Sequence, residues 1–280
     1  MIVLGAGYEV SAATQKPLTL TFGVYQSDKA TTMYRKFVPV LEAIQDIMED
    51  KLERTVNIEI KIFKTYQLAN DAIVEGNVDF VRFGPASYII AKARNSNIRL
   101  LAMEHNNGQK RFKGVVVVPS DSTIKSLMDL KGKKMAFGDK NSTIGRYLVQ
   151  AELVKVGVYA MDLQSFKYLG RHDLVAKSVE LGDFDAGSIK IGTFVKYNKE
   201  KRLRIIHSFD NVTKPWIARG GLAPEVFSLI QQALLEIKDQ QVLQELKISG
   251  FLPTSDTEYD FVRKGIEKAK SFDNKEQLNK

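Results

Sequence analysis

The chain has 280 residues, of which 44% are hydrophobic and 26% are charged, and its formal net charge is +8 at pH 7. This composition is typical of a water-soluble globular protein with room for one large domain or two of moderate size. Because the sequence contains no cysteine, it excludes disulfides, thiolate metal sites, a cysteine nucleophile and a lipid anchor on cysteine within the chain given.

Residues 1–17 precede the first predicted strand and are interpreted as a leader. They begin without basic residues, but Ser11-Ala12-Ala13 is a small-residue run like that before a signal-peptidase site. A remnant of an export signal and a disordered leader both stay open. No later apolar run approaches the ~20 residues of a membrane-spanning helix.

Strands and helices then alternate through the first third of the chain. Alternating apolar residues predict strands, and apolar residues at helical spacing predict helices. The expected strands are 18–24, 56–62 and 79–83, and the expected helices are 34–52 and 66–75. This β-α-β-α-β order predicts a largely parallel sheet with helices on both faces.

A second series of the same kind follows. Its expected strands are 114–118, 135–137, 166–169 and 185–189, and its expected helices are 124–130, 142–156 and 173–181. After a turn at Pro215, helices over 224–246 and 259–270 are expected to return to the first series. The chain is therefore predicted to form two α/β lobes with a ligand cleft and hinge between them: residues 18–112 plus 215–280, and residues 113–214.

The most informative stretch lies in the second series, where a strand, a tight loop and a helix follow one another from Met135 to Leu148. Ser142 and Thr143 open the helix. Free N–H groups of its first turn, the positive end of its dipole and both hydroxyls would converge on one point, which suits a tetrahedral oxyanion. The alternative is that these hydroxyls only cap the helix.

Three further segments strengthen the prediction of a site. Tyr88 follows a strand at its carboxyl end, where open α/β sheets bind ligands. His172 lies between a strand and a helix, and Lys214 and Trp216 lie where the chain crosses back between the lobes, adding a cation and an aromatic wall. Taken singly, Tyr88 and Trp216 are more typical of core packing, and His172 of a helix start.

Other chemistries have little support. The three histidines have no neighbour at metal-ligand spacing, and the motifs of serine hydrolases, P-loops and dinucleotide-binding folds are absent. The basic residues form no nucleic-acid-binding motif, so solvated faces explain them better. We expect no metal, no cofactor and no nucleic acid. The enzyme alternative is a phosphoryl or acyl transferase with His172 as its base.

With these motifs in place, the chain resembles the phosphonate-binding family of periplasmic solute-binding proteins, the receptors of phosphonate, phosphite and phosphate ABC transporters. The resemblance covers about residues 18–259. It rests on Phe22-Gly23-Val24, on residues 79–88, on Phe137-Gly138-Asp139-Lys140-Asn141-Ser142-Thr143-Ile144-Gly145, and on His172-Asp173 with Asp185-Ala186-Gly187.

The resemblance implies a type II periplasmic-binding-protein fold and a periplasmic or other extracytoplasmic location. It implies that Ser142 and Thr143 hold the phosphorus oxyanion, assisted by Tyr88 and His172. The backbone N–H groups of Ile144 and Gly145 would complete the cradle. By its position just after the first strand, Tyr25 is a further candidate wall.

The sequence departs from the family where the ligand's substituent is expected. Members that bind aminoalkylphosphonates place acidic residues after Asp-Ala-Gly and before a proline on the return crossover. Here these regions contain Lys190 and Lys214. Because lysine repels an ammonium group, we predict poor binding of 2-aminoethylphosphonate and favour a smaller oxyanion or one with a second negative group.

The expected mechanism is hinge closure over a small anionic ligand without any bond being broken, so we expect no enzyme activity. The expected partner is the membrane permease of an ABC transporter. The alternative is a membrane-bound sensor for which this protein is the ligand-binding module, since the residues do not separate transport from sensing. A monomer is expected.

Overall fold

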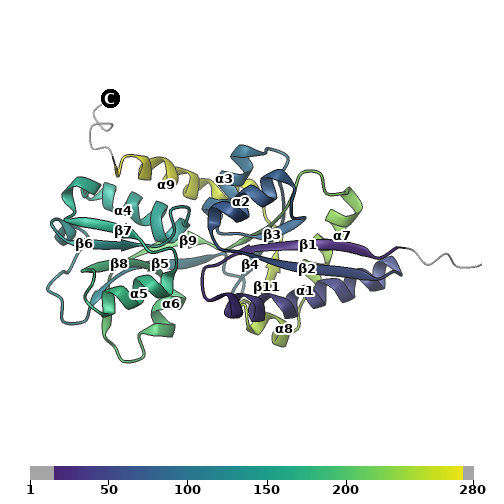
Figure 1. Ribbon diagram of the computed structural model, residues 1–280, viewed down its shortest axis with the longest axis horizontal. Helices are drawn as coiled ribbons and strands as arrows, with labels where there is room; N and C mark the ends of the chain where they lie inside the picture. The colour runs from purple at the N-terminus through teal and green to yellow at the C-terminus, as the bar shows by residue number, and fades with distance from the viewer. Residues whose placement is uncertain (1–15, 274–280) are drawn as a thin grey trace, which may run out of the picture.

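The computed structural model describes residues 16–273. Two β-sheets lie next to each other along the long axis, each with helices on its faces (Figure 1). The predicted two-lobed α/β architecture is therefore confirmed. The predicted leader, apart from Lys16 and Pro17, lies outside the described residues.

The first sheet has the strand order β11-β4-β10-β3-β1-β2. Strand β1 is parallel to β2 and β3, whereas β10 and β11 run antiparallel to their neighbours. The bounds are β1 Leu18–Tyr25, β2 Val56–Phe63, β3 Phe80–Arg82, β4 Arg99–His105, β10 Pro215–Ala218 and β11 Gly250–Leu252. The sheet is thus mixed, because β10 enters directly from the other lobe without a helical crossover.

Helices cover both faces of this sheet. The long helix α1 turns Phe37, Leu41, Ile44 and Met48 into a core shared with α7 and α8, as their helical spacing predicts. A second core lies under α2 and α3 on the other face. The bounds are α1 Ala30–Leu52, α2 Tyr66–Glu75, α3 Pro85–Arg94, α7 Pro224–Glu236 and α8 Gln240–Gln244.

The second sheet has the order β7-β6-β8-β5-β9, with β5 antiparallel to both of its neighbours. Its strands are β5 Arg111–Pro119, β6 Lys134–Phe137, β7 Ser165–Tyr168, β8 Ala186–Lys190 and β9 Leu203–Val212. Its helices are the π-helix η2 Thr143–Leu148, α4 Val149–Lys155, α5 His172–Glu180 and α6 Ile191–Tyr197, with single 3-10 turns at Met128–Leu130 and Ala160–Asp162.

Two short crossovers join the sheets. One is residues 106–110, between β4 and β5, and the other is Thr213 and Lys214, between β9 and β10. They are bonded to each other, since the Thr213 N–H donates to the Lys110 carbonyl at 2.9 Å. Such paired short segments are where a hinge between two rigid lobes is placed.

The C-terminal helix α9, Asp260–Lys270, bridges the lobes. It was expected to belong to the first lobe, and it does contact α3, but it also packs on η2 and α4 of the second lobe (Figure 1). Phe272, just beyond it, is fully buried in the second lobe's core against Phe137. The end of the chain therefore belongs to both lobes.

Three local expectations were wrong. The helix expected over 124–130 is only a 3-10 turn, because the Asp129 carboxylate accepts the N–H groups of Lys125 and Ser126 and holds them in a loop. The helix expected over 224–246 is interrupted, with Asp239 capping α8. Pro215 is no turn but the first residue of β10, a strand position that proline tolerates.

Candidate anion-binding site

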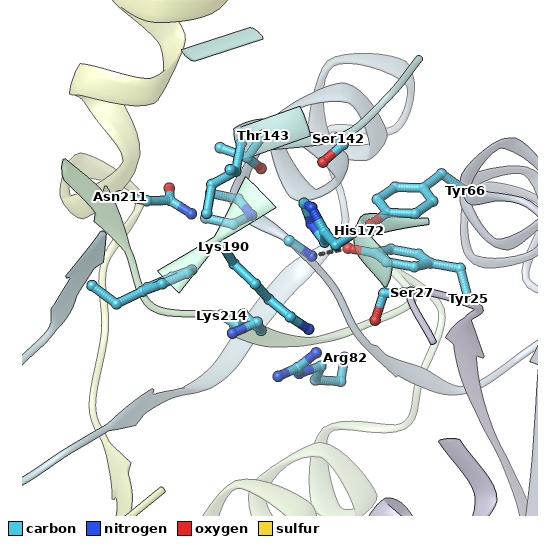
Figure 2. Close-up of a pocket in the computed structure, with 14 residues that line it drawn as sticks. Tyr25, Ser27, Tyr66, Arg82, Ser142, Thr143, His172, Lys190, Asn211 and Lys214 are labelled. Carbon is cyan, nitrogen blue, oxygen red and sulfur yellow. Dashed lines mark hydrogen bonds between the residues drawn. The ribbon is translucent and has the colours of Figure 1, made fainter. Parts of the chain in front are cut away.

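A cavity of about 400 Å³, its open mouth included, lies between the lobes. Both lobes and the return crossover contribute to its wall, which is shown in Figure 2. The lining residues are Tyr25, Ser27, Tyr66, Arg82, Gly84, Pro85, Phe112, Ser142, Thr143, Ile144, His172, Lys190, Asn211 and Lys214.

The start of η2 presents free backbone donors to this cavity. Ser142 caps the helix by accepting the Gly145 N–H at 2.9 Å. The N–H groups of Thr143 and Ile144, the two residues between Ser142 and Gly145, have no acceptor within residues 16–273. Both residues line the cavity. Unsatisfied N–H groups at the positive end of a helix are favourable for an anion.

Three hydroxyl groups add donors from both lobes. Each oxygen already accepts a backbone N–H: Ser142 from Gly145, Thr143 from Ala86 at 2.9 Å and Tyr25 from Gly84 (dashed in Figure 2). Their own hydrogens can therefore be donated, and all three side chains line the cavity, where the hydroxyls of Tyr25 and Ser142 also lie within hydrogen-bonding reach of the Tyr66 phenol. Burial raises the pKa of Tyr25, which keeps its phenol protonated.

Two buried polar atoms on the cavity wall lack a partner among the described residues. They are Nδ1 of His172, a residue 7% exposed at the first position of α5, and Oδ1 of Asn211, which is 1% exposed on β9. Burial, followed by the charges of Lys190 and Lys214, lowers the pKa of His172 to about 3, so its ring is neutral. Orphaned buried polar atoms are rare in proteins and point to a missing hydrogen-bonding partner.

Three cations surround the opposite end of the cavity: Arg82, Lys190 and Lys214 (Figure 2). Of these three cations, only Arg82 is neutralised by a carboxylate at hydrogen-bonding distance. Glu104, 2% exposed, accepts from Nε and Nη2 of Arg82 at 2.8 and 3.0 Å. Burial alone would raise the pKa of Glu104, but Arg82 and Lys214 hold it below its usual value.

The two lysines carry excess positive charge. Lys190 has no carboxylate within ion-pair distance in the described chain, and Lys214 lies 4.0 Å from Glu104 with its ammonium over the Phe112 ring. Burial and neighbouring cations lower the pKa of Lys190 to about 8 and that of Lys214 to about 7. The cavity therefore favours an anion, which would restore the charged form of both lysines.

Seven of the ten predicted site residues line the cavity: Tyr25, Ser142, Thr143, Ile144, His172, Lys190 and Lys214. Gly145 does not, and its N–H is bonded to Ser142. Among the residues that the sequence did not single out, Arg82 and Asn211 carry the most chemistry. Each lies at or near the end of a strand that leads to the cleft, and that position was the only signal for them.

Tyr88 was predicted to assist in holding the oxyanion and Trp216 to form an aromatic wall, but neither residue lines the cavity. Tyr88 is 1% exposed; one turn into α3, it faces away from the cavity, and its hydroxyl donates to Asp256 at 2.5 Å. Trp216 is fully buried inside the first lobe, stacked on Phe22, with its indole N–H donated to Glu104. Core packing was the alternative interpretation for both residues, and their tertiary contacts show that it is the correct one.

Residues 16–273 contain no group of three or more histidine, aspartate or glutamate side chains that could hold a metal ion. No helix in this part of the chain is both long and apolar enough to cross a membrane.

The sequence matches a family model described as "ABC transporter, phosphonate, periplasmic substrate-binding protein" over residues 22–259. Two curated relatives are similar. The probable ABC transporter phosphite binding protein PhnD1 of Prochlorococcus marinus (strain MIT 9301) is 27% identical, covering 79% of this chain and 82% of that protein. The phosphate-import protein PhnD of Mycolicibacterium smegmatis is 23% identical, covering 88% of this chain and 84% of that protein.

The fold is similar to solved structures of the same kind. PhnD1 of Prochlorococcus marinus in complex with methylphosphonate has a TM-score of 0.79 at 21% identity, covering 90% of this chain and 98% of that one. A binding protein component of a phosphonate ABC transporter from Pseudomonas aeruginosa has a TM-score of 0.80 at 16% identity, covering 91% and 87%. At these identities the likeness establishes the periplasmic-binding-protein fold.

Proposed function

The chain belongs to the family of periplasmic substrate-binding proteins of phosphonate ABC transporters, and from that premise we propose that its cavity captures a phosphonate, phosphite or phosphate for delivery to such a transporter. The observation that carries this proposal is the donor set at the start of η2. Free N–H groups, three hydroxyls and a neutral histidine meet in one small cavity with two under-neutralised lysines.

Capture uses both lobes. The oxyanion binds first at the second lobe, where the N–H groups of Thr143 and Ile144 and the Ser142 hydroxyl are fixed by the strand and helix that carry them. Closure about the crossovers brings Tyr25 and Arg82 of the first lobe onto the ligand. The bond from the Ala86 N–H to Thr143 Oγ1 joins the lobes in this closed arrangement. No covalent bond changes.

The relatives are named for different phosphorus oxyanions: phosphite, phosphate and methylphosphonate. A tetrahedral PO₃ or PO₄ group is what these three share. The η2 donors would hold that shared group, while the residues at the lysine end would decide which substituent is accepted.

The proposal is tested by calorimetric titration of ligand-stripped protein with phosphite, phosphate and methylphosphonate. We expect saturable one-to-one binding of at least one ligand. Replacing both Ser142 and Thr143 by alanine should weaken it by roughly 100-fold or more, since each hydrogen bond to a charged group contributes about 1.5–3 kcal/mol. No binding to any of the three, or unchanged affinity in the double variant, would overturn the proposal.

Discrimination against 2-aminoethylphosphonate is a second expected result. Its ammonium would enter the lysine end of the cavity, where like-charge contact costs on the order of several kcal/mol. We expect it to bind at least roughly 100-fold more weakly than methylphosphonate, and the variant Lys190→Glu to reduce that gap. Micromolar binding of 2-aminoethylphosphonate to the unaltered protein would contradict this expectation.

We further propose that the protein acts as a monomer and binds its ligand without turnover. Recovery of the unchanged ligand by phosphorus NMR after prolonged incubation tests the second point. Light scattering of the loaded and stripped protein tests the first.

A further inference from the structure

A second, larger cavity adjoins the first. It has an empty volume of about 1410 Å³, mouth included, and shares Arg82, Lys190 and Lys214 with the smaller cavity. The beginning of α1 and the beginning of α6 form its far walls. A ligand held at the start of η2 therefore has room to extend past the lysines toward Lys36.

The larger cavity is strongly cationic. The residues that line the two cavities include seven cations and four carboxylates, an excess of three positive charges. The cations are Arg35, Lys36, Arg82, Lys190, Lys196, Lys214 and Lys247, and the carboxylates are Asp28, Glu104, Asp173 and Glu245.

The charges are unevenly paired. Lys36 and Lys196 share one carboxylate, since their ammonium nitrogens lie 3.7 and 3.4 Å from the same oxygen of Asp28. Asp173 is paired with Arg171, which does not line either cavity. Lys190, at the junction of the two cavities, has no carboxylate within ion-pair distance in the described chain. Its side chain points toward those of Lys214 and Arg82 at this junction (Figure 2).

An unpartnered hydroxyl lies on the same wall. Thr213 is 4% exposed and lines the larger cavity, and its Oγ1 has no hydrogen-bond partner among residues 16–273. Burial, together with the neighbouring charges of Lys36 and Arg82, lowers the pKa of Lys190 and Lys214, as expected where buried cations outnumber carboxylates.

We propose that the ligand carries a second anionic group, a carboxylate, which binds in the larger cavity among Lys36, Lys190 and Lys214 while its phosphonate binds at η2. This inference rests on the proposed function. A phosphonate dianion with a carboxylate bears three negative charges, which match the excess of three on the cavity walls. An uncharged alkyl substituent would leave part of that excess uncompensated.

The test is calorimetric titration with three matched ligand pairs: phosphonoacetate with ethylphosphonate, 3-phosphonopropionate with propylphosphonate, and 4-phosphonobutyrate with butylphosphonate. We expect at least one carboxylate to bind about tenfold or more tightly than its alkyl partner. Three equal pairs, with the alkylphosphonates binding, would overturn this inference and leave the proposed function intact. Failure of every ligand would overturn both.

Two variants locate the second group. Lys36 lines only the larger cavity, so Lys36→Gln should reduce the preference for the carboxylate to within about threefold and leave methylphosphonate binding unchanged. Asp28→Asn removes a carboxylate from the same wall and should increase the preference. Lys167, exposed on β7 away from both cavities, provides the matched control Lys167→Gln, which should change neither. An unaltered preference in Lys36→Gln would contradict the placement.

Discussion

At the scale of single residues, the hydroxyl oxygens of the candidate site already accept hydrogen bonds from the protein, whereas hydroxyl and backbone donors are available for a ligand. The oxygens of Tyr25, Ser142 and Thr143 each accept a backbone N–H, so their hydrogens would be available to the proposed ligand. His172 contributes through its neutral ring, since burial lowers its pKa to about 3. It therefore adds no pH dependence between about pH 5 and 9.

The lysines are expected to make the ligand affinity depend on pH. In the free protein the pKa of Lys214 is about 7 and that of Lys190 about 8, and a bound anion raises both. Binding should therefore take up protons, and affinity for methylphosphonate should fall by about tenfold or more between pH 8 and 9.5, where the ligand itself is already largely dianionic.

Titration calorimetry at pH 8 in two buffers of different ionisation enthalpy measures this uptake. The double variant Lys190→Met with Lys214→Met should lose it. A dissociation constant that stays flat from pH 8 to 9.5 in the unaltered protein would show that these lysines do not face the ligand.

At the scale of elements, the π-helix η2 determines where the free backbone N–H groups of the candidate site lie. The N–H groups of Arg146 and Tyr147 both donate to the Ser142 carbonyl, at 3.1 and 3.2 Å. Gly145 lies against Gly138 at the end of β6, and a Cβ on Gly145 would be 2.7 Å from the Gly138 Cα. This close approach of strand and helix keeps the free N–H groups at the cavity.

Gly145→Ala should separate β6 from η2. Because the clash is with backbone, we expect a loss of about 1–3 kcal/mol in the free energy of unfolding. Phosphite or methylphosphonate affinity should also fall, by roughly tenfold or more, as the donors move away from the ligand.

Denaturant melts and titration calorimetry on the same samples check both effects. The control is Gly221→Ala, because Gly221 has an ordinary φ and its added Cβ would meet only the end of the Arg219 side chain. Normal ligand affinity in Gly145→Ala would contradict the assignment of η2 as the oxyanion cradle.

At the scale of the whole molecule, contacts between the lobes outside the smaller cavity would stabilise the proposed closed state. The Asn141 side chain of the second lobe donates to the Gln67 side chain of the first at 3.2 Å, and Lys196 lies 3.4 Å from Asp28 across the cleft. Helix α9 joins the lobes on another side through Phe272. The closed surface formed in this way is what a membrane partner would recognise.

Gln67→Ala removes one of these contacts without altering either cavity. Losing one hydrogen bond of about 1 kcal/mol from the closed state should increase the dissociation rate about fivefold and leave the association rate nearly unchanged. Stopped-flow measurement with methylphosphonate tests this. Gln164→Ala, at an exposed position of the second lobe, should change neither rate, and a slower association in Gln67→Ala would argue against a role in closure.

Much of the fold follows from local patterns. The alternating strands, the amphipathic face of α1 and the repeated β-α order each depend on near neighbours, so they could be predicted. Strands β4, β9, β10 and β11 and helices α3 and α6 were not anticipated. β10 and β11 are short, and they pair with strands that are distant in the sequence. The only local signal for α3 was Pro85 in its first turn.

The sequence by itself determined the fold class, the family and the position of the helix start proposed to bind the oxyanion, because a helix cap and a strand end are properties of adjacent residues. Tertiary structure alone decided which side chains surround the cavity. It buried Trp216, turned Tyr88 toward Asp256, and brought Arg82 and Asn211, which are far apart in the chain, to the same cavity. The physical reason is that a side chain's direction depends on the packing of its whole element, which no local pattern contains.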